Sequence, residues 1–155
     1  MNKKVLLLIA GGIALAGCAQ MPAPTTLAAN QRCQGSDCDV IVTVTRTSSA
    51  PGCSIDLPDH VAIVPNPGGV THIRWKLAGA NGFKFAQPYG IAFDKPPPLK
   101  PPPANVMPPN GGGGGPVVTL NDNHKDQSTA GSWSYSVYVT DGSVNCSKDP
   151  WVDNT

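Results

Sequence analysis

Apolar and polar residues alternate in several short segments of the chain. A clean alternation covers residues 71–77, and its two sets are Ile73, Trp75 and Leu77 on one side and His72, Arg74 and Lys76 on the other. A repeat of two residues is typical of a strand that buries one face and exposes the other. The pattern therefore predicts a strand whose apolar residues lie in a core and whose basic residues face the solvent.

Two further segments show the same repeat. The core-facing positions are Val40, Val42 and Val44 in residues 40–45, and Trp133, Tyr135, Val137 and Val139 in residues 132–140. The residues predicted to point the other way in the second segment are Ser134, Ser136, Tyr138 and Thr140. Shorter strands are predicted over residues 61–64, 83–86, 91–93 and 117–120, which brings the expected number to about seven.

Turn-forming residues separate these segments, at positions 65–69, 81–82 and 141–142. After residue 17 the acidic residues are all aspartates, which favour turns and caps over helix interiors. The strands and turns together predict an all-β fold. We expect an antiparallel β-sandwich of the immunoglobulin-like kind, in a single domain over residues 39–155.

Residues 95–116 have a different composition, because nine are prolines and five are the consecutive glycines 111–115. Such a stretch is typical of polyproline II pieces joined by a flexible hinge, so we predict a long loop inserted in the sandwich. Its beginning, residues 95–101, also matches a basic Pro-x-x-Pro peptide ligand. Because such matches are frequent in proline-rich stretches, a projecting loop is the simpler interpretation.

The first 17 residues have the parts of a secretory signal. Lys3 and Lys4 precede an apolar run that begins at Val5 and ends in small residues. The alternative is a transmembrane helix, but that needs about 20 apolar residues, and the run is shorter. The segment ends in Leu15-Ala16-Gly17-Cys18, and these four residues resemble a bacterial lipobox.

The resemblance to bacterial lipoproteins implies cleavage before Cys18 and attachment of diacylglycerol and palmitate chains to that cysteine. Two or three acyl chains anchor a protein stably, whereas one holds it only marginally. In Gram-negative lipoproteins a residue other than Asp after the cysteine, here Ala19, implies passage to the outer membrane. We therefore expect a cell-envelope protein, attached to the outer membrane through its lipid and facing either the periplasm or the surface.

Removal of a 17-residue signal peptide from the 155-residue chain would leave 138 residues, enough for one domain. Residues 18–38 are predicted to be a lipidated flexible tether with a possible small disulfide loop, since residues 19–31 are poor in large apolar side chains. Lys3 and Lys4 belong to the signal peptide, so nine of the 11 basic residues remain against ten acidic ones. This near-neutral balance disfavours a nucleic-acid partner.

Four cysteines remain besides Cys18, namely Cys33, Cys38, Cys53 and Cys146. An even number in an exported chain predicts two disulfides. Three pairings are possible, and we favour the local one, which joins Cys33 to Cys38 and Cys53 to Cys146. The Cys-x4-Cys spacing also resembles half of a zinc clip, but the sequence offers no second such pair.

Motifs for catalysis and metal binding are weak, so we predict no catalytic residue, metal ligand or cofactor. The sequence has no Gly-x-Ser-x-Gly elbow, and Asp56 and Asp59 flank a proline as turn formers do. A blue-copper site would need His and Met soon after Cys146, and residues 147–151 contain neither. Residues 121–126 alternate oxygen ligands as calcium loops do, but lack the Gly and Glu of that pattern.

These observations favour a non-enzymatic binding or structural module in the cell envelope, with the membrane contacted through the lipid and an envelope protein as a possible partner. The candidate contact surfaces are the basic stripe His72, Arg74 and Lys76 and the proline–glycine loop. Two narrower roles stay open, an accessory subunit of an envelope secretion machine and an inhibitor of a cell-wall hydrolase. The alternative class is a metal-carrying or enzymatic envelope protein.

Overall fold

The computed structural model describes residues 30–79, 82–93, 101–108 and 110–155. Cys18 and the predicted signal peptide therefore lie outside the described residues. Strands dominate the described part. They are β1 (Gln31–Cys33), β2 (Asp37–Arg46), β3 (Cys53–Asp56), β4 (His60–Ile63), β5 (Thr71–Ala78), β6 (Lys84–Phe85), β7 (Tyr89–Ala92), β8 (Asn110–Gly112), β9 (Val117–Asp122), β10 (Gly131–Ser134), β11 (Ser136–Thr140), β12 (Asn145–Lys148) and β13 (Trp151–Asn154).

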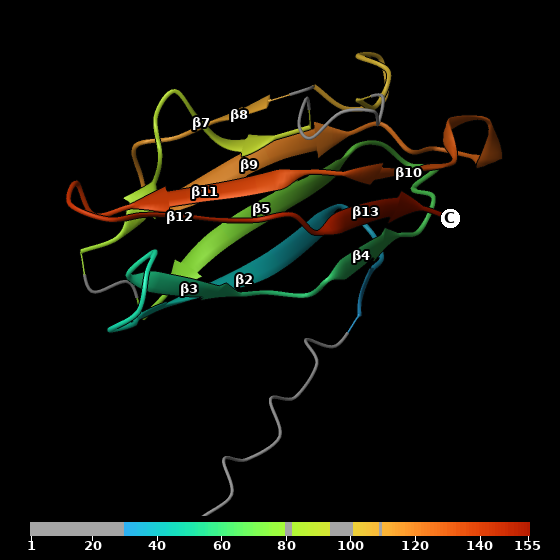
Figure 1. Cartoon of the computed structure of the whole chain (residues 1–155). Helices are drawn as coiled ribbons and strands as arrows, with labels where there is room; N and C mark the ends of the chain where they lie inside the picture. The colour runs from blue at the N-terminus through green and yellow to red at the C-terminus, as the bar shows by residue number, and fades with distance from the viewer. Residues whose placement is uncertain (1–29, 80–81, 94–100, 109) are drawn as a thin grey trace, which may run out of the picture.

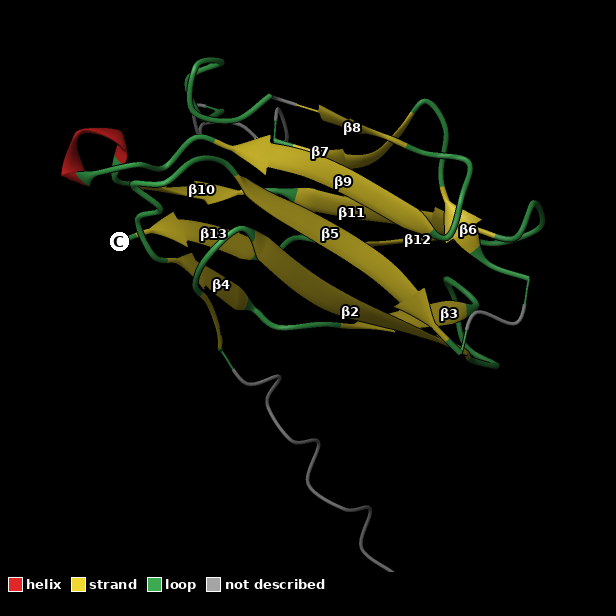
Figure 2. Ribbon diagram, turned by 180° about the vertical axis from the view of Figure 1, so that it is seen from behind, coloured by secondary structure: helices red, strands yellow, loops and turns green. Residues whose placement is uncertain are grey.

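The strands form two packed layers. One layer is the sheet with the order β3-β2-β5-β9, and the other combines the sheets β1-β4-β13-β10 and β12-β11-β7-β8. Figures 1 and 2 show the two layers from opposite sides, with β2, β5 and β9 in one and β11, β12 and β13 in the other. The prediction of an all-β sandwich is confirmed.

Three strand pairs are parallel, and they depart from the purely antiparallel, immunoglobulin-like arrangement that the sequence predicted. β2 runs parallel to β5, and β4 runs parallel to both β1 and β13. The alternation of apolar and polar residues gives the face of a strand but not the direction of its neighbour. For this reason the sequence could not distinguish parallel from antiparallel pairing.

The second layer is built around one long hairpin. Ser134 lies opposite Trp151, and Val137 lies opposite Lys148, so a single register continues from β11 and β12 into β10 and β13. The ladder is interrupted where Tyr135 meets Pro150. The N–H of Tyr135 donates to the Pro150 carbonyl at 3.0 Å, but proline has no N–H to return the bond. The single strand predicted over residues 132–140 is therefore divided in two.

Side chains on both faces of the chain are buried around this interruption. Ser134 and Ser136 are buried together with Tyr135, although the alternation predicted that the serines would be exposed. The Ser136 hydroxyl donates to Asp149 Oδ1 at 2.7 Å. A small hydroxyl side chain can be buried at little cost when it is hydrogen-bonded, so the prediction was wrong at these two positions.

The core lies between the layers, and the predicted core-facing residues of all three alternating segments reach it. Val40, Ile73, Trp75 and Val137 are fully buried, while Leu77 is half-buried. At the centre the indole Nε1 of Trp75 donates to the Tyr135 hydroxyl at 3.0 Å, and the two rings meet edge to face. Burial raises the pKa of Tyr135, so this hydroxyl is neutral at any physiological pH.

Both disulfides have the favoured pairing. Cys33 of β1 is bonded to Cys38 of β2, and Cys53 of β3 is bonded to Cys146 of β12. Because β1 and β12 belong to one layer and β2 and β3 to the other, each bond joins the two layers. The disulfides therefore fasten the sandwich at two of its margins.

Described parts of the proline–glycine segment belong to the sandwich. Val106 and Met107 are buried in the core cluster, and β8 pairs with β7. The sequence prediction of a flexible hinge at the glycines is therefore wrong, although residues 94–100 lie outside the described part. Glycines have no side chains that could show an alternating pattern, so their composition suggested a linker.

The folded domain begins earlier than residue 39. β1 and the first residues of β2 fall inside the segment 18–38 that was predicted to be a tether, and Arg32 lies opposite Ala62 of β4. The Cys33–Cys38 bond links β1 to β2, which helps to explain why residues 31–38 are ordered despite their polar composition. The part of the chain that the structure describes contains no helix with the length and apolar character of a membrane span.

Candidate ligand-binding groove

A groove opens on the outer face of the layer that contains β11, where the short strands β6 and β7 both pair with β11. β6 pairs with β11 at Val139 and Thr140, and β7 pairs with β11 at Ser136 and Val137. Between the two strands residues 86–88 leave the sheet, with a cis peptide bond before Pro88. Tyr138 lies in β11 at the level of this excursion, and its carbonyl accepts the Ala86 N–H at 2.9 Å.

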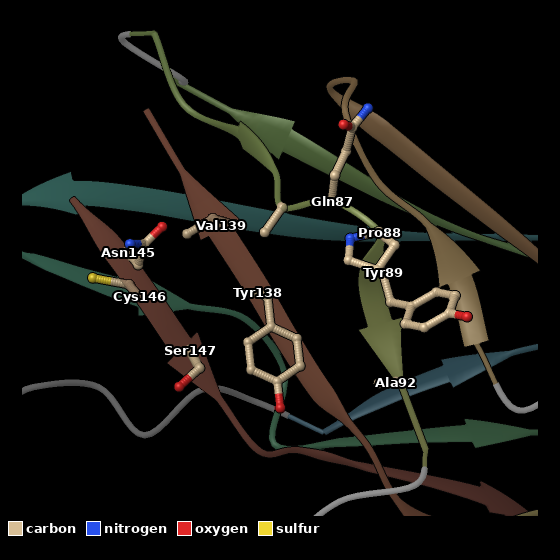
Figure 3. Close-up of a pocket in the computed structure, with 10 residues that line it drawn as sticks. Gln87, Pro88, Tyr89, Ala92, Tyr138, Val139, Asn145, Cys146 and Ser147 are labelled. Carbon is tan, nitrogen blue, oxygen red and sulfur yellow. The ribbon is translucent and has the colours of Figure 1, made fainter. Parts of the chain in front are cut away.

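The groove has a volume of about 550 Å³, within the range of roughly 300–1,000 Å³ typical of ligand pockets. Figure 3 shows Tyr138 between two walls, one formed by Pro88 and Tyr89 and the other by the side chains of β12. The lining residues are Ala86, Gln87, Pro88, Tyr89, Ala92, Tyr138, Val139, Asn145, Cys146 and Ser147. Aromatic rings and uncharged polar groups thus surround one space.

The polar side chains of the groove are free of protein partners. Within the described residues, the side chains of Gln87, Tyr89, Tyr138, Asn145 and Ser147 form no hydrogen bond. All except the half-buried Tyr138 are exposed, and Tyr89 retains 48% of its possible exposed surface. Five side chains that can donate and accept hydrogen bonds therefore face the solvent together.

The glycine run holds one wall of the groove in place. The Gly113 N–H donates to the Pro88 carbonyl at 3.2 Å, and the Gly114 N–H donates to the Phe85 carbonyl at 2.7 Å. A Cβ atom at Gly114 would lie 2.5 Å from Gln87 Nε2, which shows how closely the backbone approaches that side chain. Glycine is required at Gly113 because a Cβ atom there would clash with the Ala86 carbonyl, and at Gly114 because its φ of +99° is rarely adopted by other residues.

The opposite wall is fixed by the Cys53–Cys146 disulfide. Asn145, Cys146 and Ser147 are consecutive residues of β12, and their side chains alternate across the strand. Cys146 points inward to the disulfide, so Asn145 and Ser147 point outward to the groove. The groove is therefore built on rigid elements on both sides.

Acidic residues compensate the positive charges of the basic stripe that the sequence indicated as a contact surface. Arg74 Nε lies 2.6 Å from Asp39 Oδ1, Lys76 Nζ lies 2.5 Å from Asp39 Oδ2, and Arg74 also pairs with Asp37. Hydrogen bonds from Lys76 and then Arg74 lower the pKa of Asp39, so its carboxylate stays ionised. His72 Nδ1 lies 2.9 Å from Asn121 Oδ1 on the neighbouring strand. The stripe is thus a mixed charged surface.

A second cluster combines serine, aspartate and histidine on the outer face of β4, β13 and β10. His60 Nδ1 lies 2.8 Å from Asp153 Oδ2, and the Ser132 hydroxyl donates to the other oxygen of the same carboxylate. In a serine-hydrolase triad the histidine stands between serine and aspartate, whereas here the aspartate stands between the other two. This order leaves the serine without a histidine in contact to take its proton, so the cluster has the geometry of a surface network.

The residues that resemble the start of a calcium loop form structural contacts instead. Asp122 Oδ1 accepts hydrogen bonds from the His124 N–H at 3.0 Å and from Asn154 Nδ2 at 3.1 Å, and all three residues are buried. Asp126 caps the 3-10 helix Gln127–Thr129 by accepting the Ser128 N–H. Within the described residues no three His, Cys, Asp or Glu side chains converge as metal ligands.

The sequence analysis identified no member of the groove. Tyr138 was predicted to point away from the core, and an outward-facing aromatic residue on an otherwise polar strand face is a signal that could have indicated it. Gln87, Tyr89, Asn145 and Ser147 carry no such signal, because their positions depend on the pairing of β6, β7 and β12 around β11.

Comparison with known proteins gives this chain no family: no protein-family model matches it, and no curated protein is significantly similar to it.

Proposed function

We propose that this protein is a non-enzymatic binding module that is held at the cell envelope by lipid on Cys18, and that the groove around Tyr138 is its ligand site. The lipobox-like residues 15–18 support the anchor, and the two disulfides suit an oxidising compartment. The observation that supports the site most strongly is the set of five unpartnered polar side chains around the groove.

The composition of the groove favours binding over catalysis. Its lining, as far as the structure describes it, includes no His, Asp, Glu or Lys, the residue types that most often transfer protons in active sites. Its one cysteine, Cys146, is held in a disulfide and has no thiol for nucleophilic attack. Amides, hydroxyls and aromatic rings remain, and these groups orient and retain a ligand.

The anchor is tested by metabolic labelling in a Gram-negative host. The full chain should incorporate labelled palmitate and appear in the outer-membrane fraction, whereas Cys18→Ala should incorporate none. Ala19→Asp provides the matched control, because it should keep the label but move the protein to the inner membrane. Equal labelling of the wild type and Cys18→Ala would contradict the anchor.

The groove is tested by site-specific photo-crosslinking in intact cells. A benzophenone amino acid replaces Tyr89 in one variant and Ile41 in another, since both side chains have 48% exposure but Ile41 lies in the other layer of the sandwich. We expect an adduct from position 89 that disappears in the background Asn145→Ala/Ser147→Ala. Equal adducts from the two positions, or an adduct that survives in this background, would refute the groove as the binding site.

A further inference from the structure

We infer that the ligand of the groove is a neutral oligosaccharide. This inference rests on the proposed binding function and names the class of its ligand. It follows from three properties of the groove: the charge of its lining, the hydrogen-bonding groups that it leaves free, and the aromatic surface that it exposes.

Among the residues that the structure describes, no charged side chain lines the groove. The described lining consists of amide, hydroxyl, aromatic and aliphatic side chains and one disulfide-bonded cysteine. On the same strands, the ammonium group of Lys148 is paired with Asp59 at 2.8 Å, and Lys84 lies opposite Thr140 outside the lining. A phosphorylated, sulfated or carboxylate-rich ligand would be bound without a counter-charge, whereas a neutral ligand needs none.

The free polar groups match the chemistry of sugar hydroxyls. Each hydroxyl of a sugar is both a donor and an acceptor, and it is best satisfied by side chains that can also act in both ways. Gln87 and Asn145 each offer an amide with two donor hydrogens and one acceptor oxygen, and the hydroxyls of Ser147, Tyr89 and Tyr138 each offer one donor and an acceptor oxygen.

The aromatic surface suits the apolar face of a sugar ring. Tyr89 is exposed and Tyr138 is half-exposed, and Figure 3 shows their rings on the same side of the sheet. Tyrosine presents a flat apolar surface with a polar end, which allows it to cover C–H groups while its hydroxyl stays hydrogen-bonded. Because Gln87, Pro88, Tyr89, Asn145 and Ser147 are all exposed, a chain of sugars can extend beyond the groove.

A proline-rich peptide is the main competitor for an aromatic groove of this kind. In a polyproline II helix the proline residues offer carbonyl acceptors but no N–H donors. Such a ligand would leave the acceptor oxygens of Gln87 and Asn145 without partners in the bound state. Unpaired acceptors weaken binding, so the groove favours a ligand that supplies donors as well.

The inference is tested by NMR titration of isotope-labelled protein, residues 19–155, with both disulfides formed. The probes are chitotetraose and maltotetraose as neutral oligosaccharides, a chitosan tetramer as the charged analogue, and a nine-residue proline-rich peptide. We expect a neutral tetrasaccharide to shift the amide signals of residues 86, 87, 89, 138 and 145–147, with a dissociation constant on the order of 1 mM or tighter. The affinity measured from these shifts should be at least tenfold weaker in Asn145→Ala/Ser147→Ala. It should be unchanged in Val117→Ala, which alters an exposed position on β9.

The outcomes separate the ligand class from the binding function. Shifts of the same residues by the peptide, and none by either neutral oligosaccharide, overturn the saccharide inference and leave the groove as a binding site. Tighter binding of the charged chitosan tetramer than of chitotetraose also overturns it. Absence of any shift at the groove, together with the absence of an adduct from position 89 of the otherwise unchanged protein in cells, overturns the proposed function as well.

Discussion

A Cβ atom at Gly113 would lie 1.7 Å from the carbonyl oxygen of Ala86, far inside any allowed contact. The two backbones are held together by the hydrogen bond from the Gly113 N–H to the Pro88 carbonyl. We therefore expect Gly113→Ala to destabilise the fold by about 2 kcal/mol or more, since overpacking against rigid backbone forces the chain to move. Chemical denaturation of the two proteins measures the difference.

Gly112 provides the matched control for this substitution. It lies next to Gly113 in the same glycine run, and a Cβ atom there would meet no atom within 4 Å. Gly112→Ala should change the free energy of unfolding by less than about 0.5 kcal/mol. Equal effects of the two substitutions would show that the glycine run does not pack against residues 85–88.

The Trp75–Tyr135 hydrogen bond leads to a second prediction. Tyr135→Phe removes the acceptor of the Trp75 N–H inside the core, so a buried donor loses its partner. We expect a destabilisation of about 1–3 kcal/mol. Tyr138→Phe removes a hydroxyl that has no partner in the described structure and should have little effect on stability. Thermal unfolding measures the stability of the two variants. A larger loss of stability in Tyr138→Phe than in Tyr135→Phe would contradict the assignment of Tyr135 to the core and Tyr138 to the groove.

The two disulfides should contribute unequally to stability. Cys53 and Cys146 are separated by 93 residues, whereas Cys33 and Cys38 are separated by five. In the chain-entropy model a loop near 100 residues contributes about 4.7 kcal/mol and a loop of a few residues about 2 kcal/mol. Denaturation of Cys53→Ala/Cys146→Ala and of Cys33→Ala/Cys38→Ala should show the larger loss in the first. The reverse order would indicate that loop length does not control the effect here.

Asp141 should make stability depend on pH in the acid range. The N–H and hydroxyl of Ser143, the N–H of Val144 and the Arg46 guanidinium favour the ionised carboxylate and lower the pKa of Asp141 to about 2. Because this folded-state pKa lies below the unfolded value near 3.9, the stabilisation is present above about pH 4 and is lost as the pH falls toward 2.

The variant Asp141→Asn tests this dependence. The difference in melting temperature between the wild type and Asp141→Asn should be constant above about pH 5 and should shrink between about pH 4 and pH 2. Asp56→Asn, at an exposed position on β3, is the control for a general effect of removing one charge. A difference that stays constant down to pH 2 would show that the carboxylate of Asp141 does not stabilise the β11–β12 turn through its charge.

The core could be predicted from the sequence because burial follows the two-residue repeat of a strand. Val40, Ile73, Trp75, Val137 and Val139 are all buried as their positions predict. The pairing of strands could not be predicted in the same way. The proximity of Asp39 to Arg74 depends on the parallel alignment of β2 with β5, and no local pattern reveals that alignment.

The groove was the least predictable part of the molecule. Its members come from residues 86–89, 92, 138–139 and 145–147, and only the pairing of β6, β7 and β12 around β11 brings them together. The glycine run was misinterpreted for a related reason. Gly111 and Gly113 are needed where backbones and side chains approach closely, but a sequence of five glycines is also what a flexible linker contains.

The measurement that tests the binding role of the groove most directly is hydroxyl-radical footprinting of the lipid-anchored protein in intact cells and after purification. Tyr89 and Ile41 have the same exposure of 48% and lie in different layers of the sandwich, so they serve as site and control in one experiment. We predict that Tyr89 and Tyr138 are modified several-fold less in cells than in the purified protein, while Ile41 is modified equally in both. Equal modification of Tyr89 and Tyr138 in the two samples would contradict the proposal that the groove is occupied in the envelope.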